Sequence, residues 1–245
     1  QAPIPATEQA ASWLANLERA LVECNIAEAI ALFGDECYWR DLVAFTWNIV
    51  TMESRDEIRE MLAATLNEIR PSGWTLTEPA TEVDGVVEGW FHFETAVGRG
   101  RGILRLKDGY CWTLLTTLGE LKGFEEKAGP NREIGVQHGA IKGRQTWLER
   151  RQDEEASLGY SEQPYCVIVG GGQGGIALGA RLKRLDVPTL IIDKHDRPGD
   201  AWRKRYKSLY LHDPVWYDHM PYLPFPDHWP VFASKDQMSD WLEMY

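Results

Sequence analysis

The first third of the chain places its apolar residues at the 3.6-residue period of amphipathic helices. Residues 10–24 follow this period, and Thr7 is the predicted N-cap of the helix they form. Asn25 and Glu28 have the spacing of a capping box, which predicts a second, short helix through Phe33. The same spacing at residues 54–57 predicts a third helix. This helix is expected to stop at residue 70, because Pro71 and Gly73 follow.

From Trp74 onward the period of the pattern changes from helical to two. This alternation predicts strands over 74–78, 86–97, 99–106 and 110–118, in addition to a strand near 38–45. Asp108-Gly109 between the last two strands predicts a tight hairpin. Because helices precede an antiparallel sheet, the expected class of this part is α+β.

The stretch that follows this sheet, residues 126–163, is rich in charge and glycine. Trp147 and Leu148 are nearly its only large apolar residues, so we expect them to anchor a short helix. We therefore predict three parts: an α+β domain over 1–125, a charged linker over 126–163, and a second domain over 164–245.

The second domain opens with a continuous apolar run at 166–169, which is typical of a strand covered on both faces in a parallel sheet. A glycine-rich turn follows. Gly170 allows a sharp turn, Gly172 lets the backbone come close to a pyrophosphate, and Gly175 lets the next helix lie close to the strand. Together with Gln173 and Gly174, these residues predict a phosphate site at a helix N-terminus.

In the helix that starts in this loop, four apolar residues are predicted to form the inner face: Ile176, Leu178, Leu182 and Leu185. A second strand at 189–192 ends in Asp193-Lys194. A carboxylate at position 193 is placed to accept both hydroxyls of an adenosine ribose, and it would repel a 2′-phosphate. The site therefore suits FAD or NAD better than NADP.

Composition narrows the classes of function. The 245 residues are enough for about two domains, and an apolar fraction of 44% is that of a globular protein. A net charge of −11 argues against nucleic acid or an anionic membrane as a partner, and no apolar run is long enough to span a bilayer. The four cysteines lack metal-ligand spacing, so we expect no metal site and a cytoplasmic protein with reduced thiols.

The order of elements and the segment 37–62, CYWRDLVAFTWNIVTMESRDEIREML, resemble the cone-shaped family of nuclear transport factor two and ketosteroid isomerase, often called SnoaL-like. The resemblance covers residues 7–125. It implies an apolar pocket faced by Asp41, Trp47, Trp90 and His92. Asp41 is either a general base in that pocket, or it is ion-paired with Arg40 or exposed to solvent.

Residues 197–245 resemble the flavin-containing monooxygenases, including the plant indole-pyruvate type, and with the glycine loop the resemblance spans 164–245. It implies that Gly199 and Trp202 form the family's glycine-x-x-tryptophan motif. Leu211 and His212 correspond to the pair next to the flavin, although His212 is alternatively a packed loop histidine. Two positions depart from the family: Asp193 replaces the more frequent Glu, and His212 stands where the animal enzymes have Asn.

The same resemblance implies an FAD-dependent, NADPH-using monooxygenase that inserts one oxygen atom of O₂ into a small organic substrate through a flavin hydroperoxide. No side chain is assigned as catalytic. The alternative is an FAD-dependent NAD(P)H oxidoreductase without oxygen insertion, in which the N-terminal cone is a binding or dimerisation module of a homodimer. The second glycine-rich loop expected for NADPH does not occur, so we expect the N-terminal part of a longer enzyme.

Overall fold

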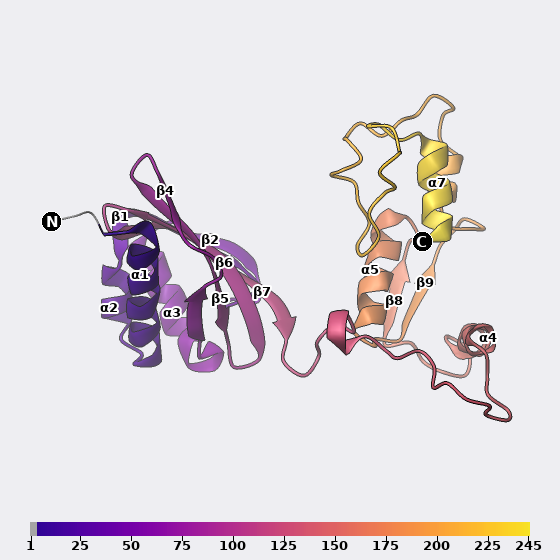
Figure 1. Ribbon diagram of the computed structural model, residues 1–245, viewed down its shortest axis with the longest axis horizontal. Coiled ribbons are helices and arrows are strands. Elements are labelled where there is room, and N and C mark those ends of the chain that lie inside the picture. Colours follow the sequence, from indigo (N-terminus) through magenta and orange to yellow (C-terminus); the bar gives the residue numbers. More distant parts are fainter. Residues whose placement is uncertain (1–3) are drawn as a thin grey trace. The chain divides into compact units, whose positions relative to one another are not determined.

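The chain divides into two compact units. The computed structural model describes residues 4–245; the first unit ends at Glu125 and the second is Glu126–Tyr245 (Figure 1). A separate linker over residues 126–163 stays a prediction, because this division places those residues in the second unit.

The first unit contains three helices, α1 (Ala6–Val22), α2 (Ile26–Ala31) and α3 (Arg55–Ile69), and two strands lie between α2 and α3 in the chain. The predicted caps of α2 and α3 are confirmed, because Asn25 accepts a hydrogen bond from the Glu28 N–H and Ser54 accepts one from the Glu57 N–H. The predicted cap of α1 is wrong. Pro5 is its N-cap, since proline's fixed φ suits this extended position, and Thr7 lies inside the first turn.

The unit also contains a seven-stranded sheet, and the helices cover one of its faces (Figure 1). The strand order is β2-β1-β7-β6-β5-β3, with β4 paired to β5, and every pairing is antiparallel except β1 with β7. The α+β class is therefore confirmed. The strands are β1 (Phe33–Leu42), β2 (Ile49–Met52), β3 (Ser72–Leu76), β4 (Thr81–Val83), β5 (Val86–Glu94), β6 (Gly98–Lys107) and β7 (Tyr110–Leu121).

The space between helices and sheet is filled by aromatic side chains. The rings of Trp74 and Phe93 are stacked with centroids 4.7 Å apart, and those of Trp39 and Phe45 meet edge to face at 5.0 Å. A Cβ at Gly102 would lie 2.5 Å from the Phe91 ring, so glycine in β6 makes room for this packing. The buried aromatic residues of this core are Trp13, Phe33, Trp39, Phe45, Trp74, Phe91 and Phe93.

The second unit contains the predicted strand–helix–strand element. Strands β8 (Cys166–Val169) and β9 (Thr189–Ile192) pair in parallel, and α5 (Gln173–Arg184) connects them. The expectation that β8 is covered on both faces is wrong: Ile168 is buried, but Val167 is 50% and Val169 83% exposed. Its other elements are η1 (Gly129–Asn131), α4 (Trp147–Ser157), α6 (Asp200–Arg203) and α7 (Lys235–Met244).

Two predicted apolar faces of this unit are wrong in detail. Leu178 is 48% and Leu185 38% exposed, because α5 approaches β9 through Gly179, where an added Cβ would lie 2.7 Å from the Ile191 side chain. Helix α4 exists, but its apolar residues do not anchor it: Trp147 is 69% and Leu148 57% exposed. A capping box of Thr146 and Glu149 begins this helix instead.

Helix α7 closes a small apolar core with the loop that precedes it. Phe225 stacks on Trp229 at 4.9 Å and meets Trp241 edge to face at 5.5 Å. The predicted capping box of Ser234 and Gln237 at the start of α7 is confirmed. Among residues 4–245, no helix combines the length and hydropathy needed to cross a membrane.

Candidate functional site

The glycine loop between β8 and α5 has a backbone that side chains would obstruct. Gly170 has a φ of +114°, in the region that favours glycine, and its N–H donates to the Ile192 carbonyl at 2.8 Å. A Cβ at Gly175 would lie 1.8 Å from the Gly170 carbonyl oxygen. The two glycines therefore let the first turn of α5 lie directly against the end of β8.

The middle of the loop has free space around it. A Cβ at Gly172 or at Gly174 would meet no atom within 4 Å. Gly172 is the N-cap of α5, and no side chain caps this helix end. The first-turn N–H groups and the positive end of the helix dipole are thus available to an anion. Gln173 has a different role, because its Oε1 accepts a hydrogen bond from Trp202 Nε1 at 3.0 Å.

Asp193, at the end of β9, lies beside the glycine loop. Its Oδ2 accepts a hydrogen bond from the Gly171 N–H at 2.6 Å, and its Oδ1 accepts one from the His195 N–H at 2.7 Å. These backbone hydrogen bonds, that of His195 first, lower the pKa of the Asp193 carboxyl. Each oxygen keeps a further lone pair for a ligand hydroxyl. The adjacent Lys194 is exposed.

Gly199 is held by protein packing. Its φ is +84°, and a Cβ there would lie 2.2 Å from the Ser239 carbonyl oxygen of α7. The next residue, Asp200, is buried and bonded to Arg203, whose guanidinium also donates to Ser239 O at 3.3 Å. Contact between α6 and α7 thus explains a glycine at this position without any ligand.

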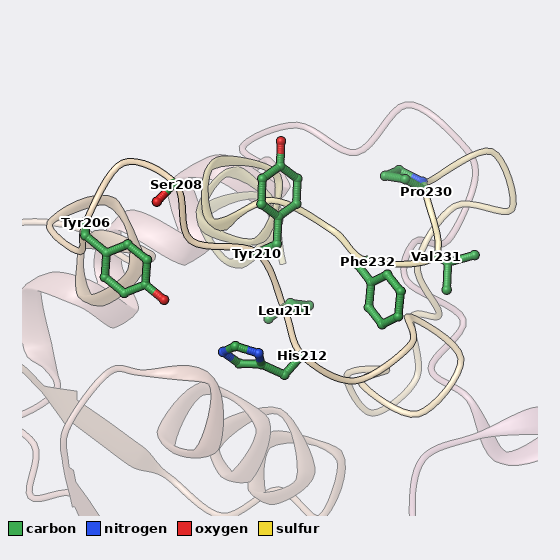
Figure 2. Close-up of a pocket in the computed structure, with 8 residues that line it drawn as sticks. All are labelled: Tyr206, Ser208, Tyr210, Leu211, His212, Pro230, Val231 and Phe232. Carbon is green, nitrogen blue, oxygen red and sulfur yellow. The ribbon is translucent and has the colours of Figure 1, made fainter.

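Two neighbouring cavities bring predicted site residues together. One, of about 570 Å³, is lined by Gln173, Gly174, Trp202, Leu211 and His212. Leu211 and His212 also line the second, of about 630 Å³ (Figure 2). The lining of this second cavity comes from two segments, residues 206–212 and 230–232. The Leu211 N–H in the first segment donates a hydrogen bond to the carbonyl of Ala233, directly after the second segment, at 2.8 Å.

Several lining residues were not predicted as site residues. They include Arg205, whose guanidinium lies 5.0 Å from the Trp202 ring centroid, and Asp218, which is half-buried and lines the first cavity. The only signal for them in the sequence is the density of aromatic and histidine residues between positions 202 and 232. The aromatic residues that line the cavities are Trp202, Tyr206, Tyr210, Tyr217 and Phe232.

The pocket expected in the N-terminal unit does not form around the four predicted residues. Trp47 is 57% and Trp90 44% exposed, and His92 is exposed as well. Asp41 is buried, but the aromatic core fills the space beside it. Arg40 does not pair with Asp41, because its guanidinium donates to Thr51 Oγ1 at 2.9 Å.

Asp41 instead holds the loop that follows β1. Its carboxylate accepts hydrogen bonds from the N–H groups of Phe45 and Thr46 at 3.0 and 2.9 Å, and from Thr116 Oγ1 at 2.9 Å. The Ala44 N–H and the Thr46 hydroxyl complete the set. A carboxylate with so many donors is satisfied in place, so both the general-base and the ion-pair interpretations of Asp41 are corrected to a structural one.

The site geometry agrees with the family comparison. Residues 168–229, which span the glycine loop, Asp193 and most of the cavity lining, match the family described as NAD(P)-binding Rossmann-like domain. This part of the second unit is thus similar to nucleotide-binding domains of the Rossmann class.

Curated relatives narrow this class. Indole-3-pyruvate monooxygenase YUCCA1 of Oryza sativa subsp. japonica is 40% identical over 83 residues, which is 34% of this chain and 20% of that protein. The uncharacterized CzcO-like oxidoreductase of Geobacillus kaustophilus (strain HTA426) is 35% identical over 79 residues, which is 32% of this chain and 23% of that protein. The predicted resemblance of the second unit to the flavin-containing monooxygenases is confirmed by the first of these relatives. The chain spans about a fifth of the length of the two relatives.

Two solved structures are similar to parts of the chain. A flavin-containing monooxygenase from Stenotrophomonas maltophilia is 30% identical, with 33% of this chain and 24% of that chain covered and a TM-score of 0.31. A ketosteroid isomerase-like protein from Erwinia carotovora atroseptica is 9% identical, with 44% of this chain and 92% of that chain covered and a TM-score of 0.38. The fold of each unit is therefore defined by its own helices and strands.

Proposed function

We propose that the chain supplies the FAD-binding part of an NADPH-using monooxygenase that transfers one oxygen atom of O₂ to a small organic substrate. The observation that carries this proposal is the glycine loop at the start of α5 with Asp193 beside it, in a segment 40% identical to an indole-3-pyruvate monooxygenase. Because the chain covers about a fifth of that relative, the substrate is left at the level of its class.

The residues present fit a dinucleotide. The open backbone at Gly172 and Gly174 suits a pyrophosphate, since no side chain blocks its approach to the free N–H groups of α5. Asp193 suits an unphosphorylated ribose, because a carboxylate accepts hydroxyl protons and repels a 2′-phosphate. The cavity beside Trp202, Leu211 and His212 suits the ring system.

A bound flavin would supply the redox chemistry, taking two electrons from a nicotinamide and activating O₂. The contribution of this chain is to bind and orient it and to exclude water. The cavity walls suit that task, because Trp202, Leu211 and Met220 present apolar surface close to the loop. No residue of the chain is proposed as a proton donor or acceptor for the reaction.

The alternative is an FAD-dependent NAD(P)H oxidoreductase without oxygen insertion. In this alternative the N-terminal unit is a binding or dimerisation module of a homodimer. One observation favours that role: Asp41, the candidate general base of the N-terminal unit, is buried and fully hydrogen-bonded. An oxygenated product formed with consumption of NADPH would separate the two reactions. The free cysteines support placing the protein in the cytoplasm.

The cofactor proposal is tested by titrating the purified chain with FAD and following flavin fluorescence. We expect saturable quenching, and we expect Asp193→Ala to weaken binding by about tenfold or more, because charge-assisted hydrogen bonds at the ribose are lost. Asp227→Ala is the matched control, since Asp227 is exposed and lies outside both cavity linings. Equal affinity for NAD and FAD, or no effect of Asp193→Ala, would contradict the proposal.

A further inference from the structure

One side-chain hydrogen bond joins the start of α5 to the opposite wall of the first cavity. Trp202 Nε1 donates to Gln173 Oε1 at 3.0 Å, although the two residues lie 29 positions apart in the chain. Gln173 is the first residue of α5, directly after the N-cap Gly172, and Trp202 belongs to α6. Both residues line the 570 Å³ cavity. The bond therefore connects the glycine loop with the cavity wall.

The local structure does not otherwise require a glutamine at position 173. Gln173 is exposed and does not cap α5, so neither core packing nor helix capping explains its side chain. Among residues 4–245, the Trp202 indole is the hydrogen-bond partner of that side chain. An indole N–H donates and never accepts, so the amide oxygen of Gln173 is the atom that suits it.

Other contacts hold the Trp202 ring in addition to this bond. The Arg205 guanidinium lies 5.0 Å from the ring centroid, within the ~6 Å range of a cation–π interaction. The ring also packs against the small apolar core of the second unit, formed by Met220, Phe225, Met238 and Leu242. The indole is thus ordered before any ligand binds. A wall ordered in advance spares the ligand the entropic cost of ordering it.

We infer that Gln173 is a positioning residue, which holds the Trp202 indole as a preformed wall for the ring system of the bound dinucleotide. The inference rests on the proposed function in one respect, that this ring system is the flavin. Because Gln173 acts through Trp202, its effect falls on the flavin end of the ligand. The adenosine diphosphate end is bound by the glycine loop and Asp193, so it serves as an internal reference.

The test is calorimetric titration with FAD and with ADP, which lacks the flavin, and the measured quantity is the preference for FAD over ADP. Gln173→Leu is expected to reduce this preference about threefold to tenfold, the range of one neutral hydrogen bond or one ordered side chain. Gln173→Glu keeps an acceptor for the indole, so its preference should match wild type, although the added charge weakens both ligands. Gln163→Leu, at an exposed residue outside both cavity linings, should behave as wild type.

Trp202→Phe shows whether Gln173 acts through the indole. This variant keeps an aromatic ring but has no N–H to donate, so adding Gln173→Leu to it should not change the preference for FAD further. In the ligand-free chain, the Trp202 indole N–H resonance in a ¹H–¹⁵N spectrum is identified by its absence from Trp202→Phe. It should move upfield in Gln173→Leu, where the hydrogen bond is lost.

Three results would overturn the inference while FAD binding itself stands. They are an unchanged preference for FAD in Gln173→Leu, a further loss when Gln173→Leu is added to Trp202→Phe, and an unmoved Trp202 resonance in Gln173→Leu. A wild-type chain that binds neither ligand, or that binds both alike, would overturn the proposed function and the inference together.

Discussion

Replacing Gly175 by alanine tests the contact on which the glycine loop is built. The new Cβ would lie 1.8 Å from the Gly170 carbonyl oxygen and 3.0 Å from its carbonyl carbon. Both atoms belong to the backbone, so no side chain can move aside. The start of α5 would have to withdraw from the end of β8 by clearly more than about 1 Å to restore a normal contact, and overpacking of this kind costs about 1–3 kcal/mol.

Gly174→Ala is the matched control because its Cβ meets no atom within 4 Å. Both positions lie in the first turn of α5, where alanine is favoured over glycine by at most about 1 kcal/mol. This gain is shared, so the difference between the two variants isolates the clash. We expect Gly174→Ala to be as stable as wild type or slightly more so, and Gly175→Ala to be less stable than the control by about 1–3 kcal/mol.

Urea unfolding of the two variants, followed by far-UV circular dichroism, measures this difference, and a parallel FAD titration reports on the loop. Gly175→Ala should also bind FAD more weakly, since the N–H groups at the helix start move with α5. Equal stability of the two alanine variants would refute the reasoning, because it would mean that α5 does not need to lie against Gly170.

Two further predictions concern the N-terminal unit. Asp41→Asn should lower its free energy of unfolding by about 2–4 kcal/mol, because several donors lose a charged acceptor, while Asp35→Asn, at a 99% exposed side chain, should have little effect; unchanged stability in urea unfolding would restore the idea of a free base at position 41. The hydrogen bond with Arg99, helped by the Gly123 N–H, lowers the pKa of the Glu125 carboxyl from 4.5 to about 2. Since the pKa of Glu125 is lower in the folded state, this stabilisation is present above about pH 4.5 and disappears as the pH falls toward 2. The free energy of unfolding of Glu125→Gln should therefore fall less than that of wild type between these pH values. Identical pH profiles of the two proteins would argue against the Arg99–Glu125 pair.

Local signals predicted much of the fold because they depend on neighbouring residues alone. The caps at Asn25, Ser54 and Ser234 and the hairpin at Asp108-Gly109 are all observed where short-range patterns indicate them. Strands β2 and β4 were missed because three or four residues are too few to show a period. Exposure of Trp147 and Leu148 was also beyond prediction, since a helix pattern does not reveal what its apolar face contacts.

The candidate site was predictable to different degrees. The glycine loop and Asp193 follow from spacing, because the turn, the helix start and the strand end are adjacent in the chain. The burial of Asp41 was not predictable, since its partner Thr116 lies 75 residues away. Asp218 carries no motif, and only the folded loop shows that its Oδ2 is left without a donor.

The most direct test of the account is the visible absorption spectrum of the purified chain after incubation with FAD and removal of the free cofactor. The account predicts flavin bands that stay with wild type and with the control Asp227→Ala and that are reduced in Gly175→Ala and Asp193→Ala. In the protein that also carries the NADPH site, these bands should bleach with NADPH and return in air. A colourless wild-type chain that instead retains NAD would contradict the central claim that this glycine loop binds FAD.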